Sequence, residues 1–403
     1  MSFARRSQGV YLLALGMLLF LPQWGEARPE FANRHGINRC TACHFSPAGG
    51  GLRNTNGKLY GAHGFQISKY ASQDFVSADM RFVHYNPAGK EDKRSGLFLM
   101  AGLIGGSVAI TPEEINTEVR AVVSHDVLNQ SNWDSYVRFR RYTDTETGWL
   151  PQYIVFGRFH APFGLLTDEH RTYTKMQTLS DYNTKMEAGL MVSGQPLDSL
   201  HYDFAVVNGE ASSAELNDGQ AELYGGISNL RYISSSQWLP LTLGVSHKFY
   251  DRVPGQKNPW AAAAYTIFSM ERLTGGWLNM DIMFEYAQAK NLNEVATAST
   301  GFPTDANYKA NILDKESKGL FGQINYYISE KFVLQFKHDR LDFNKDYSAD
   351  AYQRFGYGIK HYFAANSLMM LRFEKTKIGQ PDEKNNPFHR ADDAAWVYLQ
   401  VGI

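Results

Sequence analysis

The sequence predicts an all-β protein: an antiparallel transmembrane β-barrel of about 16 strands behind a short N-terminal segment. Apolar and polar residues alternate with a period of two over stretches of about 10 residues, as in a strand with one face in lipid. Beyond residue 27, no apolar run reaches the roughly 18 residues that a spanning helix needs. Aromatic residues are abundant, at 14% of the chain. These observations together favour a barrel over a helical membrane protein.

Residues 1–27 have the pattern of a secretory signal peptide. Arg5 and Arg6 form a positive start, and Val10–Leu21 is apolar but short for a spanning helix. Gly25-Glu26-Ala27 places small residues at the expected cleavage positions. The alternative is an uncleaved anchor helix. We expect cleavage and export, with the outer membrane as the destination.

Residues 28–74 contain the motif Cys40-Thr41-Ala42-Cys43-His44, which includes both cysteines of the chain. C-x-x-C-H is the attachment signature of a c-type haem. The thiols of Cys40 and Cys43 would form thioethers with the haem, and His44 would be an axial ligand of the iron. A disulfide is the alternative for an exported pair of cysteines. A zinc site would need a second ligand pair, which the sequence around the motif does not supply.

The segment 28–74 is short and rich in loops. Pro47–Gly51 and Asn54–Gly57 are typical of irregular structure. A domain of about 40–60 residues needs help from a covalent group or from surrounding structure. We therefore expect one covalent c-type haem in this segment, docked inside the barrel. The alternative is a free-standing periplasmic domain.

A second axial ligand of the haem iron is expected from a histidine or a methionine. His63 follows the motif at a distance that allows the chain to loop over the haem, and it is our first candidate. Met80 and His84 are the alternatives on the first predicted strand, provided that His84 faces inward.

Residues 75–403 carry the strand pattern. In Leu278–Tyr286, apolar residues two positions apart alternate with positions that include Asp281 and Glu285. Charged residues on an inward face suit a wet barrel lumen better than the core of a soluble sandwich. The predicted strands are 75–86, 97–110, 116–129, 132–142, 152–160, 184–195, 199–208, 223–234, 239–251, 260–271, 275–289, 318–328, 331–343, 352–363, 366–378 and 394–403.

The connections between these strands differ in length. Ser329-Glu330 and Ala364-Ala365 predict tight turns, whereas Phe163–Asn183, Lys290–Ser317 and Gly379–Asp392 are long and polar. Outer-membrane barrels have short periplasmic turns and long extracellular loops. We therefore expect the three long connections to be extracellular.

One stretch resembles a known family. Val155–Gly164, with the sequence VFGRFHAPFG, is similar to a strand-end motif of phosphate-selective porins, and Glu187–Gly194 resembles their next hairpin. The resemblance implies a porin-like barrel of about 16 strands. The C-terminal Ile403 departs from the aromatic residue that commonly ends such chains.

The order of segments carries a second resemblance. A signal peptide, a stretch from Phe31 to Gly36 that runs into one C-x-x-C-H, and a porin-like barrel resemble the fused monohaem cytochrome–porins of iron-oxidising bacteria. This resemblance implies an outer-membrane electron conduit, embedded in lipid. It would pass electrons from an extracellular donor such as Fe(II), through the haem, to a periplasmic c-type cytochrome. The implied activity is electron transfer, which would include Fe(II) oxidase activity if Fe(II) is the donor.

Charge and composition limit the alternatives. The formal net charge is −1, so the sequence gives no reason to expect a nucleic-acid partner. The main alternative to a conduit is a diffusion porin for small, anionic solutes with a haem-bearing plug that is structural or redox-gated. A soluble haem enzyme would need a distal catalytic pocket, for which the sequence offers no candidate residues.

Overall fold

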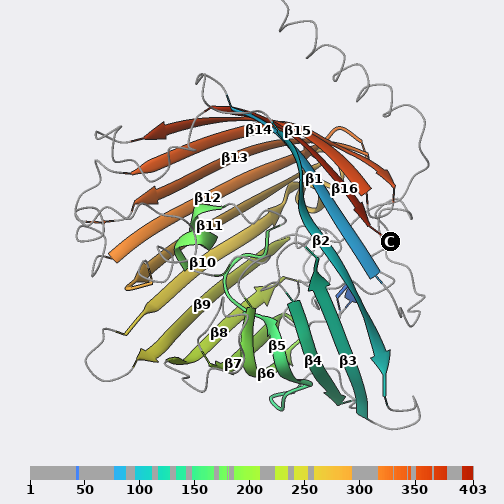
Figure 1. The fold of residues 1–403 in the computed structure, drawn as a ribbon, viewed down its shortest axis with the longest axis vertical. Coiled ribbons are helices and arrows are strands. Elements are labelled where there is room, and N and C mark those ends of the chain that lie inside the picture. Colours follow the sequence, from blue (N-terminus) through green and yellow to red (C-terminus); the bar gives the residue numbers. More distant parts are fainter. Residues whose placement is uncertain are drawn as a thin grey trace, which may run out of the picture.

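The computed structural model is a closed barrel of sixteen antiparallel strands (Figure 1). Each strand is hydrogen-bonded to its neighbours in the sequence, and β1 pairs with β16 to close the ring, with Met80 opposite Val401. The chain is therefore a simple up-and-down meander, which the alternating sequence predicts. The bounds are β1 (Ser77–Pro87), β2 (Gly96–Ala109), β3 (Thr117–Asp126), β4 (Trp133–Arg141), β5 (Tyr153–His160), β6 (Met186–Leu197), β7 (Leu200–Val207), β8 (Leu223–Ile233), β9 (Leu241–Arg252), β10 (Trp260–Ser269), β11 (Met280–Lys290), β12 (Glu316–Tyr327), β13 (Phe332–Asp342), β14 (Tyr352–Ala364), β15 (Ser367–Ile378) and β16 (Ala394–Gly402).

The described part of the chain covers the barrel and a small piece of the N-terminal segment. The predicted signal peptide, Cys40 and His63 lie outside it. None of the helices in the described part is long and apolar enough to cross a membrane. The structure describes residues 42–44, 77–87, 96–110, 117–127, 133–141, 148–167, 172–178, 180, 186–208, 223–234, 240–252, 258–292, 316–329, 331–342, 344–345, 351–364, 367–378 and 393–402.

The alternation of side chains along the strands is confirmed. On β11, Asp281 and Glu285 face inward and are buried, whereas Phe284 and Tyr286 face outward and are exposed. Large apolar side chains are exposed on the outer face all around the barrel, and the inner face carries many buried polar and charged groups. This is the arrangement of a barrel that spans a bilayer with a polar lumen.

The connections fall into two sets at opposite ends of the barrel, as the meander requires. Those between β6 and β7, β12 and β13, and β14 and β15 are tight, the last two at the predicted turns, and we call this the short-turn end. Those that follow the odd-numbered strands meet at the other end, which we call the long-loop end. They include the long connections between β11 and β12 and between β15 and β16.

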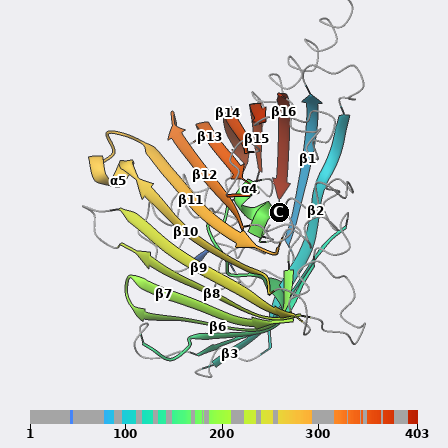
Figure 2. The same cartoon turned by 90° about the vertical axis from the view of Figure 1, so that its left-hand side faces the viewer.

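Two short helices lie outside the strand pattern. Helix α5 (Met270–Thr274) sits between β10 and β11 at the short-turn end and closes on Gly275 in the left-handed conformation. As a result, β11 begins at Met280 and not at residue 275 as predicted. Helix α4 (Tyr173–Thr178) lies between β5 and β6 and is inside the ring of strands (Figure 2).

Candidate functional site

The chain between β5 and β6 turns into the barrel instead of leaving it. We call its described residues, 161–167, 172–178 and 180, the inner segment. Before this turn, Gly157 near the middle of β5 has a φ of 133°, which is readily adopted only by glycine. A Cβ at this position would clash with the carbonyl oxygen of Ser135 on β4. After Gly157 the alternation stops, and Arg158, Phe159 and His160 are all buried in succession.

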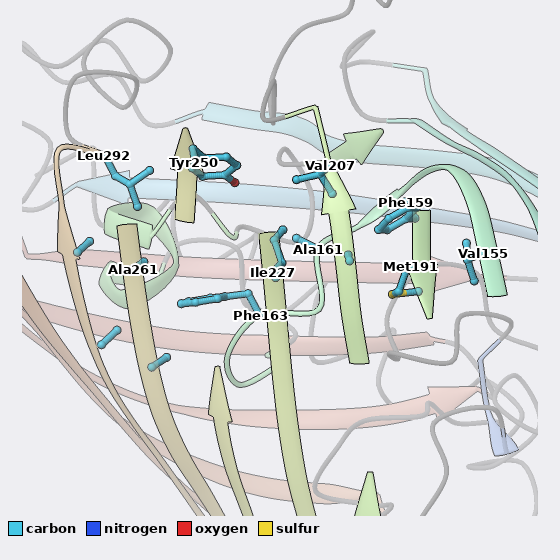
Figure 3. Packing of buried hydrophobic residues seen from close by; sticks show 14 of the residues in the cluster. Val155, Phe159, Ala161, Phe163, Met191, Val207, Ile227, Tyr250, Ala261 and Leu292 are labelled. Atoms are coloured by element: carbon cyan, nitrogen blue, oxygen red, sulfur yellow. The ribbon is translucent and has the colours of Figure 1, made fainter. Parts of the chain in front are cut away.

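Apolar side chains of the inner segment pack against the inner wall of the barrel. Phe163 is 1% exposed and lies close to Ala261 and Ile227 (Figure 3). The wall makes room for the segment by carrying small residues at inward positions. These inward positions on β7, β10 and β11 are Ala205, Ala261, Ala263, Ala287 and Ala289. One side of the lumen is therefore a dry, packed core, and its burial stabilises the inward fold of the segment.

A single carboxylate on β11 anchors the inner segment. Glu285 is 1% exposed and accepts three hydrogen bonds from it. The backbone N–H of Leu165 donates to Oε1 at 2.7 Å, and the hydroxyl of Thr174 donates to Oε2 at 2.7 Å. Lys175 Nζ donates to Oε1 at 2.9 Å and neutralises the charge. A buried carboxylate is tolerated only with such partners, so Glu285 and Lys175 depend on each other.

Backbone contacts complete the anchor on either side of Glu285. Gly164 has a φ of 67°, and its N–H donates to Ser246 Oγ on β9 at 2.9 Å. A Cβ on Gly164 would clash with Glu285 Oε1. In α4, Gln177 Nε2 donates to the carbonyl oxygen of Ala287 at 3.0 Å. The segment is thus fixed to β9 and β11, across the lumen from its root on β5.

Cation–π contacts add to this attachment. Lys248 on β9 is fully buried, with its Nζ 5.2 Å from the ring centroid of Phe163. Arg354 on β14 has its guanidinium carbon 4.7 Å from the ring centroid of Tyr173, and it is ion-paired with Asp339. Helix α4 packs against β11, β12 and β13. The inner segment therefore reaches from β5 to the opposite wall and narrows the lumen.

The expectation of a long extracellular loop over Phe163–Asn183 is wrong for the described part of that stretch. Its polarity is real, but Lys175, Gln177 and Thr178 are buried against the wall and not in solvent. Lys175 Nζ donates to Glu285, Gln177 Nε2 to the carbonyl oxygen of Ala287 on β11, and Thr178 Oγ1 to the carbonyl oxygen of Thr174 in α4. The sequence signal for this outcome is weak. It consists of Gly157, Gly164 and inward alanines, which become informative only once the strand register is known.

The haem motif is described only in part. Ala42, Cys43 and His44 are half-buried, and this short segment falls within the outline of the barrel in two perpendicular views (Figures 1 and 2). A thiol and an imidazole side by side are the donor types that c-type haem attachment requires, so these residues fit the group. Among the described residues, no set of three or more His, Cys, Asp or Glu side chains is grouped to bind a metal ion.

The two alternative axial ligands on β1 point away from the lumen. Met80 is 40% exposed, and His84 shares its outward face, whereas the inward positions Arg81 and Val83 are buried. The expectation that His84 faces inward is therefore wrong. Of the histidines on other strands, His160 is buried on the inner side, with Nε2 3.7 Å from Asp134 Oδ2.

Solved structures with a similar fold are outer-membrane porins. The chain resembles OmpF of Salmonella typhi, solved in complex with daunomycin, with 13% identity and a TM-score of 0.59 over 82% of this chain and 97% of that chain. It resembles OprB of Pseudomonas putida at high pH, with 9% identity and a TM-score of 0.54 over 82% and 94% of the two chains. It also resembles the channel DcaP of Acinetobacter baumannii, with 10% identity and a TM-score of 0.51 over 82% and 96%.

At these identities the similarity establishes the fold alone. No protein-family model matches the sequence, and no curated protein matches it either. The matched part corresponds in extent to the barrel. The class that the fold defines is a closed, porin-like antiparallel barrel of sixteen strands.

Proposed function

We propose that the chain is an outer-membrane diffusion channel for small polar solutes, with a haem-bearing N-terminal segment as a plug. The inner segment is the observation that carries the proposal. An up-and-down barrel of about 16 strands encloses a lumen that admits water and solutes unless something fills it. In this chain the inner segment narrows the lumen, and the ion pair between Glu285 and Lys175 fixes its position. A narrowed polar passage selects solutes by size and charge.

The charge of the remaining inner wall favours anions. On β13, β14 and β15 the inward cations are Lys337, Arg354, Lys360 and Arg372. The inward anions of these strands are Asp339 and Glu374. Asp339 is ion-paired with both Lys337 and Arg354, at 2.8 and 2.6 Å. Cations therefore outnumber anions on this wall, and we expect a reversal potential that indicates anion preference in a salt gradient.

Single-channel recording of the full chain in planar bilayers tests the constriction. Glu285→Gln removes the charge that holds Lys175 and should release the inner segment, so that the conductance rises about twofold or more. Asp203→Asn is the matched control. Asp203 is equally buried and accepts from Ser193 and Arg231, but its partners are all on the wall. Equal conductance of wild type and Glu285→Gln, with Asp203→Asn also unchanged, would contradict a constriction at the inner segment.

The haem is part of this proposal because of the C-x-x-C-H motif at residues 40–44. Cys40 and Cys43 would hold it covalently, and His44 would bind the iron from one side. The group supplies one-electron transfer when bound. Cys43→Ala should leave a single thioether or no covalent haem, measured as the haemochrome spectrum of the protein denatured in alkaline pyridine. Normal doubly linked haem in Cys43→Ala would contradict the assignment, whatever the channel conducts.

Electron conduction is a second candidate function. It is favoured by a C-x-x-C-H motif in a chain with a predicted signal peptide and by the partial burial of Cys43 and His44 within the outline of the barrel. Liposomes that contain the full chain and a trapped oxidant separate the two functions. A conduit should oxidise external Fe(II) with little ion leak and pass the electrons inward, where a periplasmic cytochrome would accept them in the cell. A channel should leak ions whether or not Fe(II) is present.

A further inference from the structure

The outward faces of β13, β14 and β15 are arranged in rows that run around the barrel. Phe336, Tyr357 and Phe373 are neighbours in register and form one apolar row, each at least 40% exposed. Tyr357 and Phe373 are stacked, with centroids 5.8 Å apart. Such a row of exposed aromatic residues belongs in lipid. This row marks the depth of the lipid hydrocarbon, and the rows nearer the long-loop end can be compared with it.

The next row toward the long-loop end combines aromatic rings with a cation. It consists of His338, Phe355 and Lys375, again directly opposite one another in register. His338 stacks on Phe355 with centroids 4.6 Å apart, and Lys375 is exposed. Aromatic rings beside a cation are typical of the level where hydrocarbon meets headgroups.

The row after that is polar and cationic. It consists of Arg340, Gln353 and Lys377, one residue on each strand. Lys377 is exposed, and its Nζ lies 5.9 Å from the ring centroid of Phe355 in the row below. Rows on one face of a strand are about 6–7 Å apart, so the change from aromatic to cationic takes place over the depth of a lipid headgroup.

The cations continue onto the neighbouring strands. Lys318 on β12 faces outward next to Asp342, with 3.6 Å between Nζ and Oδ2, and 35% of its side chain remains exposed. Lys290 is the outward residue at the end of β11, directly opposite Glu316 on β12, whose carboxylate is paired with Lys345 at 2.8 Å. We call Lys290, Lys318, Arg340, Lys375 and Lys377 the outer cationic patch. On β9, the outward positions toward the same end hold His247, Phe249 and Asp251, so the patch is a feature of one sector of the wall.

We propose that the outer cationic patch binds the phosphate groups of an anionic glycolipid in the outer leaflet of the membrane. The patch is continuous with the lipid-facing rows, so lipid headgroups are the molecules that meet it. Arginine and lysine bind phosphate strongly through charge-assisted hydrogen bonds. This binding site is independent of what passes through the lumen. It requires only that the barrel spans the membrane with its long-loop end outward.

Lipid binding to the full chain in detergent tests the proposal. The probes are a bisphosphorylated lipid A and the same lipid with both phosphates removed, and bound lipid is counted by native mass spectrometry. We expect Arg340→Gln or Lys375→Gln to weaken binding of the phosphorylated lipid about fivefold each, and the double variant more than tenfold. Lys331→Gln, at the short-turn end of the same hairpin, is the matched control and should bind like the wild type.

Two results would overturn the proposal. One is equal affinity for the lipid without phosphates, and the other is unchanged lipid binding by the double variant. If that variant also separates from a multimer into single chains, the patch is a contact between copies. Heat-dependent gel mobility verifies that each variant is a folded barrel. A closed channel, which would sink the diffusion proposal, leaves this test unaffected.

Discussion

Lys175 Nζ lies 2.9 Å from Glu285 Oε1, and this pair joins helix α4 inside the lumen to β11 on the far wall. Both side chains are nearly inaccessible, at 4% and 1% exposure. Burial of one of these charges without the other would cost several kcal/mol. The inner segment therefore has one energetically favoured position, which it keeps only while both residues are present.

Substitution of Gly164 tests how tightly this position is determined. Gly164→Ala should destabilise the inner segment for two reasons, a left-handed φ of 67° and a clash of the new methyl group with Glu285. The first costs on the order of 1 kcal/mol. Gly275→Ala is the matched control, because its φ is 64° but no atom lies within 4 Å of the added Cβ. Proteolysis of the folded barrel should cut the inner segment in Gly164→Ala and spare it in Gly275→Ala. Equal protection of the two variants would mean that the clash is relieved without movement of the segment.

The barrel itself could be predicted from the sequence because the residues of each strand alternate between the lumen and the lipid. On β11, Asp281 and Glu285 face the lumen, whereas Phe284 and Tyr286 face outward. Once the turns are recognised, this alternation also determines the register. The inner segment could not be predicted in this way. Its polar residues match a surface loop, and their partner Glu285 is distant in sequence. A polar residue in the sequence indicates that its side chain needs hydrogen bonds, but it does not indicate whether water or the protein supplies them.

The alanines of the inner wall provide a second test of the packed side of the lumen. Ala263→Leu should place a larger side chain into the space occupied by the inner segment and cost about 1–3 kcal/mol of stability through overpacking. Its neighbour Ala264 is the control, because it faces outward into the lipid-facing surface. Ala264→Leu should change stability by no more than about 0.5 kcal/mol. The measurement is the urea midpoint of unfolding in lipid vesicles. Similar midpoints for the two variants would mean that Ala263 does not contact the segment.

The orientation of the barrel can be tested with one residue from each end. Lys345 follows β13 at the long-loop end, Ser329 lies in the tight turn before it, and both are exposed. A membrane-impermeant maleimide applied to intact cells should label Lys345→Cys. It should label Ser329→Cys only after the outer membrane is permeabilised. The reverse pattern would put the short turns outside the cell and invert the topology.

The second axial ligand of the predicted haem can be tested with a control that the structure supplies. If His63 is that ligand, His63→Ala should convert a low-spin haem into a high-spin one and shift its reduction potential, because the iron loses a strong-field ligand. His84→Ala is the matched control. His84 lies on the outward face of β1, from which its imidazole cannot enter the lumen, so the haem spectrum should not change. The absorbance of the oxidised and reduced proteins, recorded in detergent, decides between the outcomes. A low-spin spectrum in His63→Ala would mean that another residue, on the inner face of the barrel, is the second axial ligand. His160 is then a candidate, because it is a buried histidine at the root of the inner segment.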